Sequence, residues 1–242
     1  MMEPLQKGRV FALSILAGLV AGGILVGINL VLVQPYTNAL ADIELENLLA
    51  EGEFFEEEYD AQLQSIYFSQ LYGSIIIGLA GGALVGGAFV VGRIRAGPLK
   101  GALLIAGIAW FVLYVIPTVK YPPSPEVLFD REVAGTYQML LAGYTAVSGL
   151  AALGIAIGFR KVKRKQKAYG AAALYLAVVA GAFFAFPYYQ SEDDSFLPQP
   201  VLNAWRSAIS LSMTAFWFAL GAICELLWAY GSKKRVNNNL EY

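Results

Sequence analysis

Nine carboxylates crowd into the segment between Gln34 and Ile66, and they are the chain's clearest candidates for chemistry. They are Asp42, Glu44, Glu46, Glu51, Glu53, Glu56, Glu57, Glu58 and Asp60. The segment contains no Lys, Arg or His. Carboxylate oxygens are hard ligands, and an acidic field without internal cations concentrates divalent cations around itself. A run of charge also serves as a solvated face, so the residues alone leave both interpretations open.

Five of these acids are the predicted cation-attracting residues. Asp42, Glu44 and Glu46 follow soon after the first apolar run, where an ion would approach a membrane helix. Glu53 and Glu57 are four residues apart, so a helix would place them on one face. The sequence has no calcium loop of the D-x-D-x-D-G type. We therefore predict loose attraction of cations rather than a dedicated calcium site.

Neutral oxygens lie near the same ends of the apolar runs. Asn29, Gln34 and Gln70 form a predicted polar seam that could pass a partly dehydrated cation. Neutral polar side chains in membrane helices also bond to neighbouring helices, and this alternative stays open. In the last apolar run, we expect Glu225 to form a structural ion pair and Cys224 to pack as a small apolar residue.

The chain lacks the residue patterns of an enzyme. It has no His, and its single Cys excludes an internal disulfide. No glycine cluster fits the G-x-x-x-x-G-K-[ST] pattern of a nucleotide-binding loop, and H-E-x-x-H is absent. We therefore expect no catalytic residues, no covalently bound cofactor and no nucleic-acid partner.

The elements that must position these residues are membrane spans. Hydrophobic residues make up 57% of the chain and charged ones only 14%, whereas soluble domains average about a quarter charged. The sequence predicts an all-α polytopic helix bundle, one integral membrane domain over residues 1–242. Six spans are expected, with five as the alternative. Their approximate ranges are 10–33, 67–92, 101–118, 133–159, 168–188 and 202–230.

The acidic segment at 34–66 is predicted to be an amphipathic helix at the membrane surface. Its apolar residues recur at three- and four-residue steps, as on one side of a helix. They are Leu45, Leu48, Leu49, Phe55, Tyr59 and Leu63. At the start of this segment, Pro35 should terminate or kink the first span. Within that span, Gly18–Gly22 and Gly23–Gly27 are G-x-x-x-G pairs, which allow close helix packing.

The basic residues predict how the chain is oriented. Fourteen of the seventeen Lys and Arg fall in the N-terminus, the 93–100 turn, the 160–167 loop and the C-terminal tail. Basic loops favour the cytoplasmic side of a membrane. Both termini are therefore expected in the cytoplasm and the acidic segment outside. Arg206, at the outer start of the last span, is predicted to be an interface anchor or a partner for the outer acids.

The order of these features resembles the CbtA family of cobalt transporter subunits, which are small prokaryotic membrane proteins. The resemblance is carried by Val33-Gln34-Pro35, Asp42-Ile-Glu44-Leu-Glu46, Lys120-Tyr-Pro-Pro-Ser-Pro125 and Trp205-Arg206, and it spans nearly the whole chain. It implies five spans and places family motif positions in this sequence. They are Gln34, Pro35, Glu44, Glu46, Tyr121, Pro122, Pro123, Trp205 and Arg206.

The resemblance implies a permease component for divalent transition-metal uptake, with cobalt as cargo, in the prokaryotic inner membrane. It also implies a small single-span membrane protein as partner, whose histidines ligate the metal, which fits the absence of His here. Membrane lipid is the other expected partner, and a homo-oligomer stays open. From another functional class, a non-transporting scaffold whose acidic helix docks a partner protein is the alternative.

Overall fold

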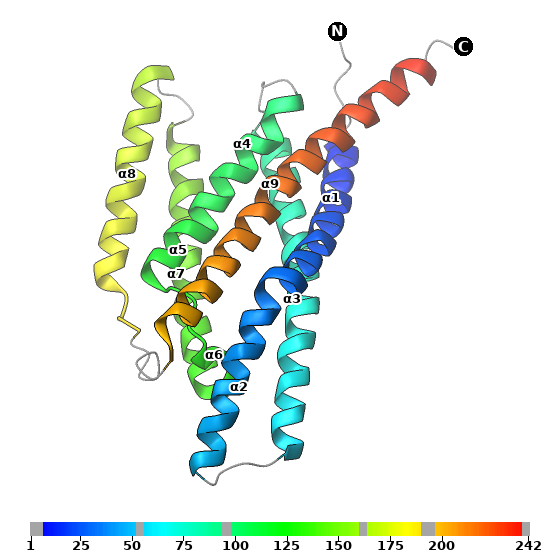
Figure 1. The fold of residues 1–242 in the computed structure, drawn as a ribbon. Helices are drawn as coiled ribbons and strands as arrows, with labels where there is room; N and C mark the ends of the chain where they lie inside the picture. The colour runs from blue at the N-terminus through cyan, green and yellow to red at the C-terminus, as the bar shows by residue number, and fades with distance from the viewer. Residues whose placement is uncertain (1–6, 52–55, 93–97, 160–163, 190–196, 239–242) are drawn as a thin grey trace. The chain divides into compact units, whose positions relative to one another are not determined.

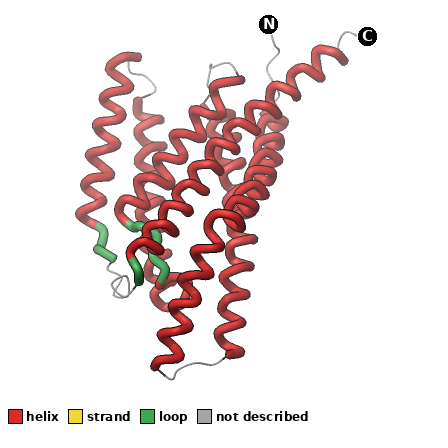
Figure 2. The backbone as a smooth tube through the Cα atoms, in the orientation of Figure 1, coloured by secondary structure: helices red, strands yellow, loops and turns green. Residues whose placement is uncertain are grey.

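Every element in the described part of the chain is helical (Figures 1 and 2). The structure is a computed structural model, and it describes residues 7–51, 56–92, 98–159, 164–189 and 197–238. Within these ranges, five helices are long and apolar enough to cross a membrane. The predicted span at 168–188 is represented by a shorter apolar helix over Tyr169–Ala185. The all-helical polytopic prediction is confirmed, with five candidate spans in the described ranges.

The chain divides into two compact units. Unit 1 comprises residues 1–109 and 198–242, and unit 2 comprises residues 110–197. Unit 1 holds the acidic segment and the predicted polar seam. Unit 2 holds the motif Lys120-Tyr-Pro-Pro-Ser-Pro125, which we call the proline-rich loop. Whether both act as the single membrane domain expected from the sequence remains a prediction.

Unit 1 is organised around its first helical path. This path runs without a break through α1 (Lys7–Ile28), the π-helical turn η1 (Asn29–Val33) and α2 (Gln34–Glu51). The remaining helices are α3 (Glu56–Gly92), α4 (Pro98–Trp110) and α9 (Gln199–Asn238). α3 and α9 both pack against the first path, so it forms the centre of the unit.

Glycines set the contact between α1 and α3. A Cβ added at Gly22 would lie 2.9 Å from the carbonyl oxygen of Ser74, and one at Gly78 would lie 2.7 Å from the Gly22 Cα. A Cβ at Gly18 would collide with the Gly78 carbonyl. The predicted G-x-x-x-G packing therefore holds for Gly18–Gly22. The second pair has no such role, because added Cβ atoms at Gly23 and Gly27 would meet nothing within 4 Å.

Pro35 does not end the first helix. The Gln34 amide bonds to the Asn29 carbonyl across a widened turn, so η1 admits the proline ring and α2 continues to Glu51. The next donor in this register would be the nitrogen of Pro35, which carries no hydrogen. The chain thus passes the proline by widening one turn rather than by stopping.

The acidic segment is not one helix lying along a surface. Its first half belongs to α2 and its second half to the start of α3, which run as two antiparallel arms (Figure 1). Leu45 and Leu48 on α2, and Tyr59 and Leu63 on α3, are half-buried. The apolar positions expected to form one stripe are therefore divided between the two arms.

Unit 2 contains η2 (Phe111–Val115), α5 (Ile116–Lys120), α6 (Glu126–Phe129), α7 (Arg131–Gly158) and α8 (Arg164–Ala185). Asp130 caps α7, because its Oδ1 accepts hydrogen bonds from the backbone amides of Glu132 and Val133 at 2.7 and 3.0 Å. α7 packs against η2, α5 and α8, so it forms the centre of this unit.

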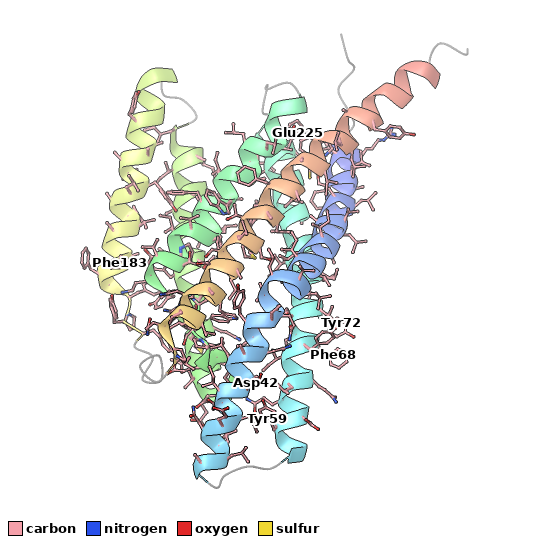
Figure 3. All side chains as sticks on the ribbon, in the orientation of Figure 1. Asp42, Tyr59, Phe68, Tyr72, Phe183 and Glu225 are labelled. Carbon is pink, nitrogen blue, oxygen red and sulfur yellow. The ribbon has the colours of Figure 1, made fainter. Side chains whose placement is uncertain are left out.

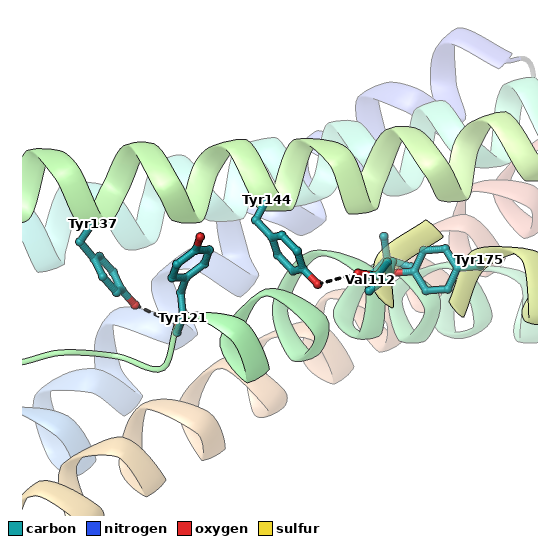
Figure 4. Close-up of a cluster of buried hydrophobic side chains, with 6 residues drawn as sticks. Val112, Tyr121, Tyr137, Tyr144 and Tyr175 are labelled. Atoms are coloured by element: carbon teal, nitrogen blue, oxygen red, sulfur yellow. Dashed lines mark hydrogen bonds between the residues drawn. The ribbon is translucent and has the colours of Figure 1, made fainter. Parts of the chain in front are cut away.

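A second π turn shows how a backbone carbonyl finds a hydrogen-bond donor when a proline removes its usual one. In η2 the Ile116 amide bonds to Phe111, and the next donor in register would be Pro117, opposite the Val112 carbonyl. Ser148 Oγ donates to that carbonyl at 2.6 Å, and the Tyr175 hydroxyl therefore donates to Ser148 at 2.7 Å. Figure 4 shows Val112 and Tyr175 in the buried cluster of unit 2. The lost backbone bond is replaced by side chains from α7 and α8.

Candidate cation site

The two acidic arms bring carboxylates from distant parts of the sequence into one region. The Tyr59 hydroxyl on α3 donates to the Ala41 carbonyl on α2 at 2.9 Å. Asp42, Glu44 and Asp60 lie close enough for their negative charges to act on this hydroxyl. Figure 3 labels Asp42 and Tyr59 at the level where the arms face each other. The field predicted from composition therefore has a physical location between two helices.

The predicted cation-attracting acids differ in how far the structure describes them. Asp42 and Glu46 are exposed, and Glu44 is half-buried with interactions of its own. Glu53 lies outside the described residues. Glu57 belongs to α3, but its side chain is not among those described. Among the described residues, no three His, Cys, Asp or Glu side chains come together as a metal-binding group. The described acids thus do not form an enclosed metal site, and their attraction of cations stays a prediction.

Asn29 bonds to two other helices at once. Its Nδ2 donates to Ser74 Oγ on α3 at 3.2 Å, and its Oδ1 accepts a short hydrogen bond from Ser212 Oγ on α9. Ser74 Oγ in turn donates to the Gln70 carbonyl at 2.7 Å. Of the predicted seam residues, Asn29 therefore uses both ends of its amide to join helices.

Gln34 and Gln70 differ from Asn29, because each offers a spare acceptor. The side-chain oxygens Gln34 Oε1 and Gln70 Oε1 are both buried and have no hydrogen-bond partner. Gln34 Nε2 donates to Asn38 Oδ1 at 2.7 Å, which fixes its amide with the nitrogen toward Asn38. A buried amide oxygen without a donor is costly, so these two atoms need a water molecule or a cation.

The antiparallel pairing places these two glutamines at one level of unit 1. On one side of them, Asn29 bonds to Ser74; on the other, Tyr59 bonds to Ala41. Gln34 and Gln70 fall between these two levels on their own helices. Beyond η1 the backbones of α2 and α3 also approach less closely than those of α1 and α3. The two glutamines thus lie where α2 and α3 begin to separate, between Asn29 and the acidic arms.

α9 runs antiparallel to the whole first path and closes the site from its other side. Three hydrogen bonds mark the pairing. Trp205 Nε1 donates to Thr37 Oγ1 at 3.1 Å, Ser212 bonds to Asn29, and Trp228 Nε1 donates to Ser14 Oγ at 3.2 Å. Arg206 follows Trp205 on α9, which lies beside α2. Its side chain is half-buried and already has an interaction partner.

Two expectations for the last span also have outcomes. Cys224 is fully buried in the described core, as expected for a packing residue. Glu225 is also buried, and its Oε1 accepts a hydrogen bond from the Leu103 amide of α4 at 3.3 Å. Its carboxylate is thus held by a backbone donor. The cations within reach in the sequence are Lys233 and Arg160, whose side chains lie outside those that the structure describes, so the ion pair stays a prediction.

The proline-rich loop of the family motif is a structural piece of unit 2. Tyr121 is fully buried, and its hydroxyl donates to the Pro187 carbonyl at 2.8 Å. The Tyr137 hydroxyl lies within hydrogen-bond distance of the carbonyls of Tyr121 and Pro122. Pro123 continues the same loop into α6. These residues hold a turn of unit 2 in shape.

Sequence inspection missed the serines that organise both units. Ser74, Ser212 and Ser148 each stand in an apolar run and are buried. Each bonds to another helix. A hydroxyl in an apolar run was the available signal, but such serines are common in membrane helices. Only the partner across the interface shows which serine matters.

The comparisons with known proteins identify the family of the chain. A family model described as "Probable cobalt transporter subunit (CbtA)" matches residues 8–229, which is most of the chain. No curated protein and no solved structure matches.

Proposed function

Because the chain belongs to the CbtA family of probable cobalt transporter subunits, we propose that unit 1 carries divalent cobalt from the acidic arms to the two glutamines. The family is one of transporter subunits rather than of enzymes, and the chain is a multi-pass membrane protein. Cobalt is the cargo, and the word subunit implies partner proteins. The proposal adds a route within this chain.

The first step of the route is electrostatic. Asp42, Glu44 and Glu46 stand on α2, and Asp60 on the facing arm of α3. An acidic field raises the local concentration of cations without binding them tightly. Glu53 and Glu57 belong to the same proposal from the sequence. Loose attraction suits a transporter, since an ion that is held too tightly cannot move on.

The second step depends on the spare oxygens, and this observation carries the proposal. Gln34 is eight residues before Asp42 on α2, so the ion would travel about 12 Å along the helix. Two carbonyl-type oxygens can replace some of the water around a divalent cation without adding charge. Asn29 lies on the side of the glutamines that is away from the acidic arms. It joins three helices, so in this proposal it marks the end of the step and does not ligate the ion.

The direction of transport follows from the distribution of charge. Both termini are proposed to be cytoplasmic and the acidic arms external, because the basic loops predict that orientation. The membrane is then the prokaryotic cell membrane implied by the family resemblance. In this orientation the acids meet the ion before the glutamines do. Arg206, on α9 beside α2, is proposed to limit how far the acidic field spreads.

The partner in this proposal is a small single-span protein that bears histidines. The chain has no His, and its described residues contain no metal-binding group of three. Cobalt favours imidazole nitrogen over neutral oxygen alone, so a second protein would supply the tight site. This chain would then deliver the ion rather than retain it.

Cobalt accumulation in cells tests the route. The double change Gln34→Leu with Gln70→Leu should reduce uptake at least tenfold, since it removes both spare acceptors. Glu44→Gln with Glu46→Gln should raise the cobalt concentration needed for half-maximal uptake and leave the maximal rate nearly unchanged. Glu132→Gln, which alters an exposed acid of unit 2, is the matched control. Normal uptake by the double leucine variant would remove the glutamines from the route.

The scaffold alternative is favoured by one observation: Asp42, Glu46 and Asp60 on the arms are exposed, and the described acids do not enclose a metal. In that case the arms would dock a basic partner and the chain would move no ion. Proteoliposomes separate the two functions. Cobalt entry into vesicles that contain the chain and a histidine-bearing partner supports transport, and binding of the partner without entry supports the scaffold.

A further inference from the structure

Lys120 is a buried cation that the proposed cobalt route does not use. It ends α5 in unit 2, and only 6% of its surface is exposed. Its neighbours are aromatic: Nζ lies 4.5 Å from the ring centres of both Phe183 and Tyr188, and 5.8 Å from that of Tyr121. We define Lys120 with these three rings as the lysine cage.

The cage leaves the ammonium without an acidic partner. No carboxylate among the described residues lies within ion-pair distance of Lys120, and its contacts there are with the aromatic rings. An ammonium carries three N–H donors, and ring faces are weak acceptors for them. Burial of an unpaired charge is unfavourable unless an anion accompanies it. Within the described part of the chain, the cage therefore has no anion with strong acceptor oxygens.

Simple extension of the side chain into water does not explain this arrangement. A lysine that snorkels buries its stem but keeps its head in solvent. Here only 6% of the residue's surface stays open, and two rings at equal distance fix the position of Nζ. The ammonium is thus held at a set place, as in a site prepared for a ligand.

Exposed apolar residues adjoin the cage residues in the sequence, and they indicate what kind of molecule carries that anion. Val119, Phe184 and Tyr188 are 68%, 86% and 73% exposed, although two of them are strongly apolar. Val119 precedes Lys120, and Phe184 follows the cage residue Phe183 on α8, which Figure 3 labels. A ligand at the lysine cage would contact a positive charge and apolar side chains together. A free phosphate ion would satisfy only the charge.

We propose that the lysine cage binds the phosphodiester group of a membrane glycerophospholipid, with its acyl chains against Val119 and Phe184. The phosphate oxygens accept hydrogen bonds from Lys120 Nζ, and the rings of Phe183 and Tyr188 hold the ammonium in line. Tyrosines are typical of the interface where lipid phosphates lie, and Tyr188 is the exposed wall of the cage.

This site gives the two units different roles. A fixed positive charge repels divalent cations, so the lysine cage would not lie on the path of cobalt. Unit 2 would instead anchor the chain to lipid through its loop and the end of α8. The inference does not rest on the proposed function, because lipid binding is measured without any metal.

Lipid binding to the delipidated full-length chain in dodecyl maltoside tests the proposal. Native mass spectrometry would compare three probes: phosphatidylglycerol, dioleoylglycerol without a phosphate, and glycerol 3-phosphate without acyl chains. We expect phosphatidylglycerol to bind at least tenfold more tightly than either other probe, since only it satisfies both features. Equal binding of dioleoylglycerol would show an apolar surface only. Equal binding of glycerol 3-phosphate would show a free-anion site, and either result would overturn the proposal.

Variants locate the site. Lys120→Gln should weaken phosphatidylglycerol binding about tenfold, whereas Lys120→Arg should keep most of it, because guanidinium also donates to phosphate. Lys7→Gln, which removes an exposed charge of unit 1, is the matched control and should bind as the unchanged chain does. Unaltered binding by Lys120→Gln would contradict the proposal. The comparison of the three probes on the unchanged chain stands even if that variant does not fold.

Discussion

Asn29 shows how much structure a single neutral side chain can organise in a membrane protein. One amide connects η1 to Ser74 on α3 and to Ser212 on α9. Lipid offers no replacement partner for either end of the amide. The residue therefore fixes the level at which three helices meet, and with it the level of the two glutamines.

Replacing Asn29 should cost stability rather than cation attraction. Asn29→Ala removes two interhelical hydrogen bonds, and we expect a loss of about 1–2 kcal/mol in unfolding free energy. The measurement is unfolding in mixed micelles followed by circular dichroism. Thr214→Ala is the control, because Thr214 Oγ1 donates to the Ser210 carbonyl of its own helix at 2.7 Å. Equal losses for the two variants would show that the bridge contributes nothing.

At this scale the sequence identified the right kinds of residue but not their separate tasks. Asn29, Gln34 and Gln70 were grouped because all three are neutral and polar near the ends of apolar runs. The structure separates them, since Asn29 is fully bonded through its amide whereas the two glutamine oxygens are not. A sequence does not show which acceptor atoms have a hydrogen-bond donor once the helices pack.

The sequence likewise showed Lys120 only as the first residue of the Lys120–Pro125 motif, and not as a buried cation.

The two π turns are the elements that sequence reasoning misjudged. Pro35 was expected to terminate or kink its helix, and the predicted third span stopped just after Pro117. Both helices widen over one turn and continue, so the termination considered for Pro35 is wrong, and the kink stays a prediction. Widening is tolerated where the surroundings can satisfy a freed carbonyl, as Ser148 does for Val112. That condition depends on neighbouring helices, so local propensity could not reveal it.

Glycines provide a matched test of helix packing on the same element. Gly18→Ala should separate α1 from α3 and cost on the order of 1–3 kcal/mol, because the new Cβ meets backbone that cannot yield. Gly23→Ala should be neutral or stabilising by up to about 1 kcal/mol, since its Cβ meets open space and alanine favours helix. Unfolding in mixed micelles measures both. Similar values for the two would contradict the glycine contact.

At the scale of the whole molecule, the sequence was most informative about class. Long apolar runs predicted an all-helical membrane protein, and family membership agrees with the resemblance drawn from short motifs. The number of spans was less secure, because α8 has a short apolar part, Tyr169–Ala185. The division into two units was not foreseen. Periodicity reports which residues avoid water, but not which helices pack together.

Sidedness is a prediction for the complete chain in its membrane. The only native cysteine is buried, so new cysteines report cleanly on exposure. Glu46→Cys should react with a membrane-impermeant maleimide in intact cells, and Lys7→Cys only after the cells are opened, because basic ends stay inside. The reverse pattern would place the acidic arms in the cytoplasm and end the proposal of import.

The bond between Asn29 and Ser212 joins positions 183 residues apart in the sequence, and this has a consequence for biogenesis. At ordinary ribosome speeds, roughly 10 to 40 s separate the synthesis of the two residues. During that interval Asn29 Oδ1 lacks the hydrogen bond that Ser212 later donates. We expect the insertion machinery to shield it until the final helix arrives. A truncated polypeptide ending before residue 199 would keep the defect and become a substrate for membrane proteolysis.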